Sequence, residues 1–287
     1  MRFIFVTPSY RGDFERCKLL CESTTRFLPS GVEHLLLVDR RDLSMFKPLQ
    51  NRTVRVIEAE SLLPWWIFRV PGLSGWRLNM TGFPVRNWIY QQLLKISAAC
   101  AADAEVINFI DSDVTLTRSV DLDYFVQDGL IRLQRTDHES PTHRRWLEVA
   151  RRTLDIPATA HISGNYIGNV ITWRHDNAIK MIDRIERVSG CSWQKTLAKK
   201  STFSEYMLYG TFVENILGIE KAECFLDDRP NLHLCWNYDF KTDDGIRAFF
   251  DDTPHDSFGI MIHSKYGIPV SSYRHQVLKL WDRQEQK

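Results

Sequence analysis

Two aspartates one residue apart follow an apolar run in the stretch VINFIDSDVTLT, residues 106–117. Like charges this close repel each other, so a protein separates them, solvates them or places a cation between them. Residues two apart in an extended chain face the same way, so Asp111 and Asp113 can reach one object. A divalent cation such as Mg²⁺ or Mn²⁺ prefers oxygen ligands and would relieve the repulsion. The pair therefore predicts a metal site, whereas Asp121 and Asp123 share the spacing but lack the apolar run.

The segments around this pair predict strands that alternate with helices. Short apolar runs favour strands, and apolar residues at helical spacing favour helices. The predicted strands are RFIFVTPS (2–9), EHLLLVDR (33–40), TVRVIEAESLL (53–63) and EVINFID (105–111), and the predicted helices are FERCKLLCESTTRFL (14–28), VRNWIYQQLLKISAACAA (85–102) and DNAIKMIDRIERV (176–188). Such alternation indicates an α/β fold with a mostly parallel sheet flanked by helices. We expect one domain over 1–287, in which the irregular part 118–287 completes a cleft over the sheet built by 1–117.

Composition narrows the class of partner and the location. The 37 Lys and Arg nearly balance the 36 Asp and Glu, so net charge offers no argument for nucleic acid. The six cysteines lack the close pairs of zinc sites or small disulfide frameworks, which favours reduced thiols. The N-terminal apolar run is too short for a signal peptide, and no apolar run reaches the about 18 residues of a membrane span. A cytoplasmic protein is expected.

Several stretches together resemble GT-A glycosyltransferases. FIDSDV is similar to the Asp-x-Asp motif of that family, and FVTPSYRGD resembles its first strand and nucleotide-contacting loop. QQLLKISAA resembles the helix before the motif, and SEYMLYG and IMIHSKYG complete an order similar to uncharacterised bacterial proteins of the DUF6492 type. The resemblance implies a GT-A-like, Rossmann-type fold. It also implies that Mn²⁺ or Mg²⁺ on the aspartates, with Ser112 between them, binds the diphosphate of a nucleotide sugar, most simply a UDP-sugar.

The loop after the first strand offers hydroxyls and a guanidinium. Loops at this edge of an α/β sheet face the cleft, so Thr7, Ser9, Tyr10 and Arg11 are candidates for nucleotide contact. The alternative is an ordinary turn that ends a strand.

One face of the predicted helix at 85–102 carries Trp88, Gln92 and Lys95, which are three and seven residues apart. The resemblance places this helix against the donor site and would direct Gln92 and Lys95 at a phosphate or at the aspartates. A solvated helix surface explains the same residues.

His263 follows a second apolar run and precedes Lys265. A neutral imidazole can bind Mn²⁺, and a lysine can neutralise diphosphate. The resemblance places a metal-binding histidine near the C-terminus, which makes His263 the third candidate ligand. A purely structural histidine is the alternative.

The stretch TFSEYMLYGTFVE has Ser204, Glu205 and Tyr206 at the expected start of a helix, where Ser can cap the first turn. The alternative is that Glu205 only interacts favourably with the helix dipole. Sugar transfer with inversion, however, needs a carboxylate as general base near the acceptor hydroxyl. Glu205 is our candidate for this base, and Tyr206 for acceptor contact; with retention, Glu205 would only orient the acceptor.

Two further regions could contact a substrate or a surface. HISGNYIGNVITW (161–173) is rich in Gly, Ser and Asn, which predicts a close-packed loop where Gly164 and Asn165 approach a sugar. The Trp-rich segment 62–83 could pack as core or lid, or could contact a membrane surface near a lipid-linked acceptor.

The sequence thus predicts a metal-dependent glycosyltransferase that acts on a glycan, a lipid-linked or a small-molecule acceptor. A nucleotidyltransferase is an alternative, although TPSYRGDFER has one Gly and mixed charge where that class has a Gly-rich basic loop. A non-catalytic module that binds nucleotides or sugars is the alternative outside enzymes.

Overall fold

The computed structural model describes residues 1–69, 75–79, 84–138 and 140–285. Its centre is a five-stranded sheet in the order β11-β7-β1-β2-β3, in which only β11 runs antiparallel to its neighbour. These strands are β1 (Phe3–Ser9), β2 (Glu33–Val38), β3 (Val54–Glu58), β7 (Val106–Ile110) and β11 (Val170–Arg174). The four predicted strands and the α/β fold with a mostly parallel sheet are confirmed.

The edge strand β11 corrects one prediction. HISGNYIGNVITW was expected to be a loop, but only its part up to Asn169 is one. From Val170 to Trp173 the side chains are buried, and the strand pairs with β7. Val, Ile, Thr and Trp all favour strands, and this preference prevails once the loop residues end.

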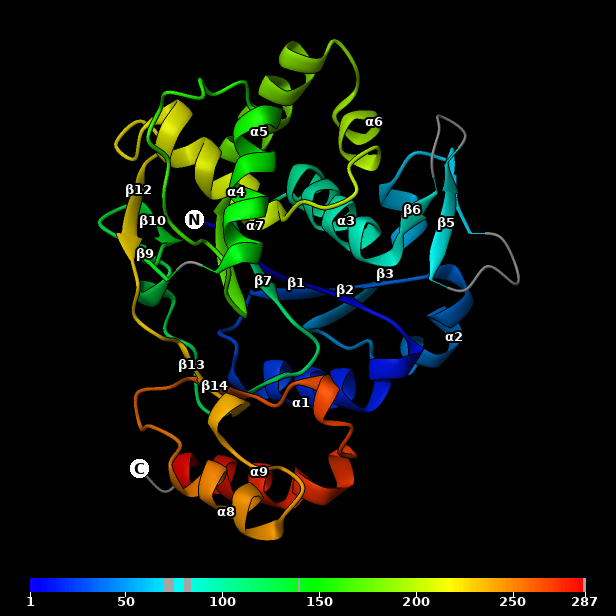
Figure 1. Ribbon diagram of the computed structural model, residues 1–287. Helices are drawn as coiled ribbons and strands as arrows, with labels where there is room; N and C mark the ends of the chain where they lie inside the picture. Colours follow the sequence, from blue (N-terminus) through cyan, green and yellow to red (C-terminus); the bar gives the residue numbers. More distant parts are fainter. Residues whose placement is uncertain (70–74, 80–83, 139, 286–287) are drawn as a thin grey trace.

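Helices cover both faces of the sheet (Figure 1). The α-helices of the described residues are α1 (Phe14–Phe27), α2 (Leu43–Phe46), α3 (Asn87–Ala101), α4 (Pro141–Thr153), α5 (His175–Ser189), α6 (Trp193–Ala198), α7 (Glu205–Phe212), α8 (Asp243–Asp251) and α9 (Val270–Glu285). Alternate residues of β1 serve the two faces: Ile4 and Val6 join the core under α3 and α7, while Phe3 and Phe5 join the core under α1 and α9. The sheet is therefore buried on both sides, as its apolar strands require.

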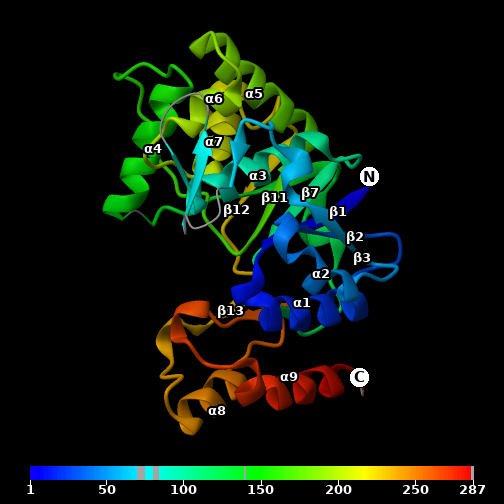
Figure 2. The same cartoon turned by 90° about the vertical axis from the view of Figure 1, so that its right-hand side faces the viewer.

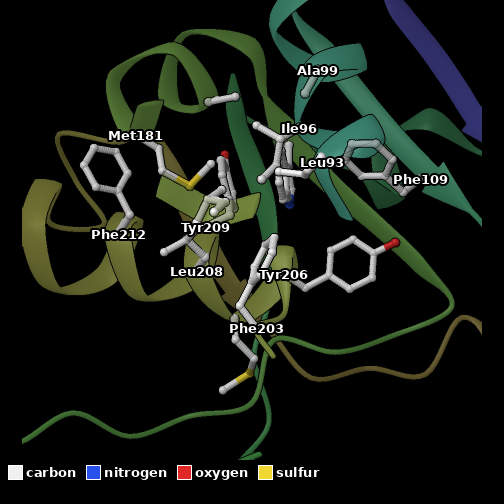
Figure 3. Close-up of a cluster of buried hydrophobic side chains, with 14 of the residues drawn as sticks. Leu93, Ile96, Ala99, Phe109, Met181, Phe203, Tyr206, Leu208, Tyr209 and Phe212 are labelled. Carbon is white, nitrogen blue, oxygen red and sulfur yellow. The ribbon is translucent and has the colours of Figure 1, made fainter. Parts of the chain in front are cut away.

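One part of the core lies between α3, α7 and β7. Figure 3 shows Leu93 and Ile96 of α3 facing Tyr206 and Tyr209 of α7, with Phe109 of β7 beside them. Trp173 stacks on Tyr209, with ring centroids 4.3 Å apart. Such packing holds two helices and a strand in a fixed relation, so the polar residues at their ends are held as well.

Two three-stranded sheets are built mainly from the second half of the chain. One has the order β12-β10-β9 and the other the order β13-β14-β8. Their strands are β8 (Val114–Leu116), β9 (Val126–Gln127), β10 (Leu130–Gln134), β12 (Cys224–Asp227), β13 (Leu232–Leu234) and β14 (Gly259–Met261). β8 follows the aspartate pair directly and runs antiparallel to β14, so Val114 lies opposite Met261. This pairing brings the segment after β14 to the aspartates. Helices α8 and α9 lie beyond α1 (Figures 1 and 2), and α9 packs against α1 through Phe27 and Trp281.

The Trp-rich segment forms a small antiparallel sheet beside α3 (Figure 1). Its strands are β4 (Ile67–Phe68), β5 (Trp76–Asn79) and β6 (Val85–Arg86). Residues 70–74 and 80–83 of the segment lie outside the described residues. Trp66 is partly buried against the core, whereas Trp65 is 77% exposed and Trp76 is 37% exposed. The segment is thus neither wholly core nor wholly surface.

Two further findings concern the chain as a whole. All six cysteines lie in the described part of the chain, and all are free thiols. None of the described helices has the length and apolar character that crossing a membrane requires.

Candidate active site

A cavity of about 480 Å³ opens at the carboxyl ends of β1 and β7. This is the edge where ligands bind in open α/β sheets. Residues from seven separate segments line it, and nine of the sequence-predicted site residues are among them: Gln92, Lys95, Asp111, Ser112, Asp113, Glu205, Tyr206, His263 and Lys265. The structure therefore brings together most of the side chains that were singled out one by one along the chain.

The aspartate pair occupies the short turn between β7 and β8. The Asp111 side chain is 41% exposed, whereas Asp113 is more enclosed and its Oδ2 accepts the Ser264 N–H at 3.4 Å. Burial, together with the negative charges of Asp111 and Asp13, raises the pKa of Asp113 to about 7. The cations of the site therefore do not fully compensate the negative charge of Asp111 and Asp113.

Asp13 is a third carboxylate at this position, and sequence reasoning missed it. It ends the short helix η1 (Arg11–Asp13) after β1 and lines the same cavity. Ser112 Oγ lies 3.5 Å from its Oδ2, and burial is the main cause of its raised pKa. The only signal in the sequence was its place in the loop after the first strand, the loop in which Tyr10 and Arg11 drew attention.

Lys95 connects the aspartates to α7. Its Nζ donates to Tyr206 Oη at 2.7 Å and lies 3.1 Å from Glu205 Oε1 and 3.4 Å from Asp111 Oδ1. Burial alone would lower the pKa of Lys95, but Tyr206, Asp111 and Glu205 together raise it well above its ordinary value. The ammonium is therefore held charged in an interior position, with one carboxylate on each side.

Glu205 begins α7 and is almost completely buried. As predicted, Ser204 caps the helix: its Oγ accepts the Met207 N–H at 3.3 Å. The Glu205 N–H is bound by Gln92 Oε1 at 3.2 Å, so the Gln92 side chain serves the start of α7. Burial raises the pKa of Glu205, and Lys95 offsets this only in part. A carboxylate with a raised pKa accepts a proton more readily than an exposed one.

His263 and Lys265 enter the cavity from the turn after β14. The His263 Nδ1 accepts the Lys265 N–H at 3.0 Å. Burial lowers the pKa of His263, so the ring is neutral and carries its proton on Nε2. A metal ion on either nitrogen would require this hydrogen bond to break. In the present orientation His263 offers a donor, which suits a phosphate oxygen.

The candidate metal ligands differ in how well they fit a divalent cation. Within the described part of the chain, no three His, Cys, Asp or Glu side chains are placed to hold an ion by themselves. Asp111 and Asp113 nevertheless fit Mg²⁺ or Mn²⁺, because such ions are often held by one or two carboxylates and complete their coordination with water and substrate phosphates. The raised pKa of Asp113 shows that a cation here would relieve unfavourable charge. The predicted third ligand, His263, does not fit as it is placed.

The four candidates for nucleotide contact at the end of β1 and in the loop after it differ in their surroundings. Thr7 is fully buried, and its hydroxyl donates to Ile110 O at 2.7 Å and contacts His34 at 2.9 Å. It therefore cannot contact a nucleotide, which corrects the prediction: its position in the strand points it into the protein. Arg11 is ion-paired with Asp42 at 2.8 Å. Ser9 and Tyr10 line a second cavity.

That second cavity, of about 300 Å³, lies at the ends of β1, β2 and β3. It shares Pro8 and Gln91 with the first, so the two adjoin. Asp39 at the end of β2 pairs with Arg77 at 2.5 Å and with Arg69 at 3.2 Å. The Arg77 guanidinium also stacks on the Tyr90 ring, 3.3 Å from its centroid. Sequence reasoning did not single out this group, because its members are up to about fifty residues apart.

The predicted sugar-contacting loop is displaced by a few residues. Asn165 is buried and its Oδ1 accepts the Ile167 N–H at 3.0 Å, while Gly164 packs against Arg135. Neither lines the cavity; Ile167, Gly168 and Asn169 do. The prediction named the wrong Gly-Asn pair because the chain repeats it four residues later, immediately before β11. A Cβ at Gly168 would lie 2.5 Å from the Gln134 amide, so a larger residue there would displace this side chain, whose Nε2 donates to Ile167 O.

Two stacked tryptophans form the outer wall of the main cavity. Trp88 of α3 and Trp146 of α4 have ring centroids 5.5 Å apart, and Trp146 Nε1 donates to Thr202 Oγ1. Trp88 was predicted to share a helical face with Gln92 and Lys95, and all three line this cavity. A half-exposed indole presents a flat apolar face, which suits the apolar face of a sugar ring.

Residues 5–281 match one family model, described as a family of unknown function (DUF6492). The chain belongs to the DUF6492 family. No curated protein matches it in sequence.

Several solved structures share the broad arrangement of this DUF6492 chain. Mouse xyloside xylosyltransferase 1, in its apo form, is 10% identical, with a TM-score of 0.46, over 94% of this chain and 100% of that one. Galactosyltransferase LgtC in complex with donor and acceptor sugar analogs is 11% identical, with a TM-score of 0.46, over 96% and 95%. An active-site mutant of LgtC is 10% identical, with a TM-score of 0.48, over 98% and 95%.

A buried histidine of β2 contacts β1, the strand that pairs with β7, and provides a test by pH. His34 contacts the hydroxyls of Thr7 at 2.9 Å and Thr24 at 3.0 Å, and burial lowers its pKa to about 3. In the unfolded chain His34 takes up a proton below about pH 6.5, whereas in the folded protein it stays neutral. We therefore expect its contribution to the free energy of unfolding to fall by about 1.4 kcal/mol per pH unit between pH 6.5 and 3.

Urea unfolding of the protein and of His34→Gln at pH 7, 6 and 5 measures this contribution. The difference between the two removes the effect of other groups, such as Asp113, whose raised pKa acts in the opposite direction. Parallel pH dependences in the two proteins would show that His34 is not buried as a neutral ring.

Proposed function

We propose that this DUF6492 protein is a glycosyltransferase that moves a sugar from a nucleotide sugar, with UDP as the carrier, to an acceptor hydroxyl. One observation carries the proposal: a single cavity at the carboxyl edge of the sheet combines an aspartate pair, donors for phosphate and a buried carboxylate. Phosphate recognition and proton transfer are the two tasks that such a reaction needs at one place. Both halves of the chain supply the groups, since 1–117 carries Asp111, Asp113 and Lys95 and 118–287 carries Glu205, His263 and Lys265.

The donor would extend across the two adjoining cavities. Its nucleoside lies in the smaller cavity beside Ser9, Tyr10 and the Asp39 cluster, and its diphosphate passes Pro8 into the larger one. There Asp111 and Asp113 would hold Mg²⁺ or Mn²⁺, which supplies charge neutralisation for the diphosphate when bound. Lys265 and the Nε2–H of His263 would contact phosphate oxygens. The group that leaves is thus surrounded by positive charge and donors.

The acceptor would enter between Glu205 and the tryptophans. Trp88 and Trp146 offer a flat surface for a sugar ring, and Asn169 offers an amide for hydroxyls. The acceptor oxygen bonds to the anomeric carbon while the bond from that carbon to the diphosphate breaks. With inversion the hydroxyl proton passes to Glu205; since Lys95 lies at Oε1, Oε2 is the atom that takes it. With retention Glu205 only orients the acceptor.

A thermal-shift panel of nucleotide sugars, with and without Mn²⁺, tests the donor assignment. We expect a UDP-sugar with Mn²⁺ to raise the melting temperature, because a ligand at 100 times its Kd stabilises the folded state by about 2.7 kcal/mol. The matched control is the free sugar without nucleotide, which should give no shift. If no nucleoside diphosphate shifts the transition, the donor site is wrongly assigned.

The same panel separates the alternatives. A nucleotidyltransferase would respond to nucleoside triphosphates and release pyrophosphate. A non-catalytic module would bind the nucleotide sugar tightly without hydrolysing or transferring it. Measuring release of UDP after each positive shift therefore decides among the three.

A further inference from the structure

A third cavity, of about 530 Å³, lies on the other side of the start of α3. Trp76 of β5, Pro84, Ile89 of α3 and Ala198 of α6 supply an apolar lining. Its remaining walls carry Arg86, Lys199, Lys200 and Ser201. Figure 1 shows α6 and the β4–β6 sheet side by side next to this end of α3, and α3 contacts both. The mechanism proposed above uses none of these residues.

The charges around this cavity all have one sign. Among the described residues that line it there are three cations and no carboxylate. Arg86 lies over the Trp76 ring, 5.2 Å from its centroid, and within the described part of the chain neither Lys199 nor Lys200 forms an ion pair. Burial and the neighbouring charge of Arg152 lower the pKa of Lys200. An anion bound here would therefore relieve repulsion between cations that the protein leaves uncompensated.

The cavity adjoins the reaction site through two continuous stretches of chain. Ile89 lines it, and the preceding residue, Trp88, lines the main cavity. Ala198 to Ser201 line it, and the same segment continues to Ser204 and Glu205 in the main cavity. Since Ser201 and Ser204 are three residues apart, their Cα atoms lie within about 11 Å of each other. The two cavities therefore lie close to each other.

An apolar cavity with a cationic rim fits an amphipathic anion. The apolar walls favour a hydrocarbon chain, since each buried CH₂ contributes about 0.8 kcal/mol. Lys and Arg at the rim favour a phosphate. We propose that this cavity binds the lipid end of the acceptor, a single hydrocarbon chain joined through phosphate to the polar group that receives the sugar. This deepens the proposed function by naming the acceptor class, and it rests on that function only for the reaction at the polar end.

Binding of dodecyl phosphate below its critical micelle concentration, measured by titration calorimetry on the full chain, tests the proposal. We expect dodecyl phosphate to bind at least tenfold more tightly than inorganic phosphate or dodecyl maltoside, because each of these supplies only one half of the ligand. Lys199→Glu with Lys200→Glu should weaken binding at least tenfold, and Trp76→Ser should weaken it as well. Lys195→Glu is the matched control: Lys195 is exposed on the same helix α6 and lies outside the cavity lining, so this variant should bind as the unaltered protein does.

The outcomes separate this proposal from the one on which it builds. If the charge-reversed variant loses dodecyl phosphate but keeps the UDP-sugar thermal shift, the lipid cavity is supported independently of the donor site. Equal binding of dodecyl phosphate by the charge-reversed and control variants would overturn the cavity assignment and leave the donor site intact. Binding only to vesicles of anionic lipid, with none to the soluble probe, would also overturn it, in favour of a surface contact.

Discussion

Asp113→Asn is expected to lower metal-dependent sugar transfer by about two to three orders of magnitude, the effect of removing one electrostatic contact from a preorganised site. The same change should leave the fold intact and raise stability at pH 8. Because burial and Asp111 raise the pKa of Asp113 to about 7, the carboxylate present at pH 8 is less favourable in the folded protein than in the unfolded chain. Asparagine removes the charge, so activity and stability should move in opposite directions.

Transfer assays with a Mn²⁺ titration, together with urea unfolding at pH 8 and pH 5, measure both effects. Asp123→Asn is the matched control, because Asp123 belongs to an aspartate pair of the same spacing but is exposed and lies outside the cavity. It should change neither quantity. Undiminished transfer in Asp113→Asn would rule out the proposed metal site, and reduced stability at pH 8 would contradict the charge balance described above.

Lys95→Met should have the largest effect on stability. It leaves Glu205, which is 1% exposed, without its cation, and breaking a buried ion pair from one side costs about 3–5 kcal/mol. For a chain of this size the melting temperature should fall by the order of 10 °C. Transfer should be lost as well, since the variant protonates Glu205 and removes the charge beside Asp111.

A double-mutant cycle tests whether Lys95 and Glu205 stabilise the protein as an interacting pair. Glu205→Gln added to Lys95→Met should recover most of the lost stability, because no uncompensated charge remains at that position, and the coupling should exceed about 2 kcal/mol. The double variant should stay inactive. Lys18→Met is the control, as Lys18 is exposed on α1 and its loss should change stability by less than about 0.5 kcal/mol. Additive effects of the two substitutions would show that Lys95 and Glu205 act separately.

Local patterns were enough to locate the strands and several of the polar residues at their ends. Four apolar runs became the parallel strands, and the SEYM stretch became a capped helix start, because burial and capping depend on a few neighbouring residues. The aspartate pair was found in the same way, since β7 ends at Ile110 and the turn follows at once. Where the pattern was ambiguous, as with the two Gly-Asn pairs before β11, the prediction chose the wrong one.

The sequence predicted the directions in which side chains point less well than their positions in the fold. Thr7 and Ser9 both face away from Pro8 along β1, yet Thr7 is bonded inside the protein and only Ser9 lines a cavity. His263 was correctly expected near the aspartates, but its Nδ1 is occupied by the Lys265 N–H. Such differences depend on neighbours that are distant in the chain or on backbone geometry in a turn, which residue types do not report.

The sequence by itself determined the α/β class, the main sheet strands, the aspartate pair and the identity of most residues that line the main cavity. Only the tertiary structure decided that Lys95 stands between Asp111 and Glu205, that Asp13 joins the aspartates, and that Asp39 holds Arg69 and Arg77 beside a second cavity. The physical reason is distance along the chain: Lys95 and Glu205 are 110 residues apart. Their contact arises from the packing of α3 against α7, which hydrophobic burial across the whole core determines.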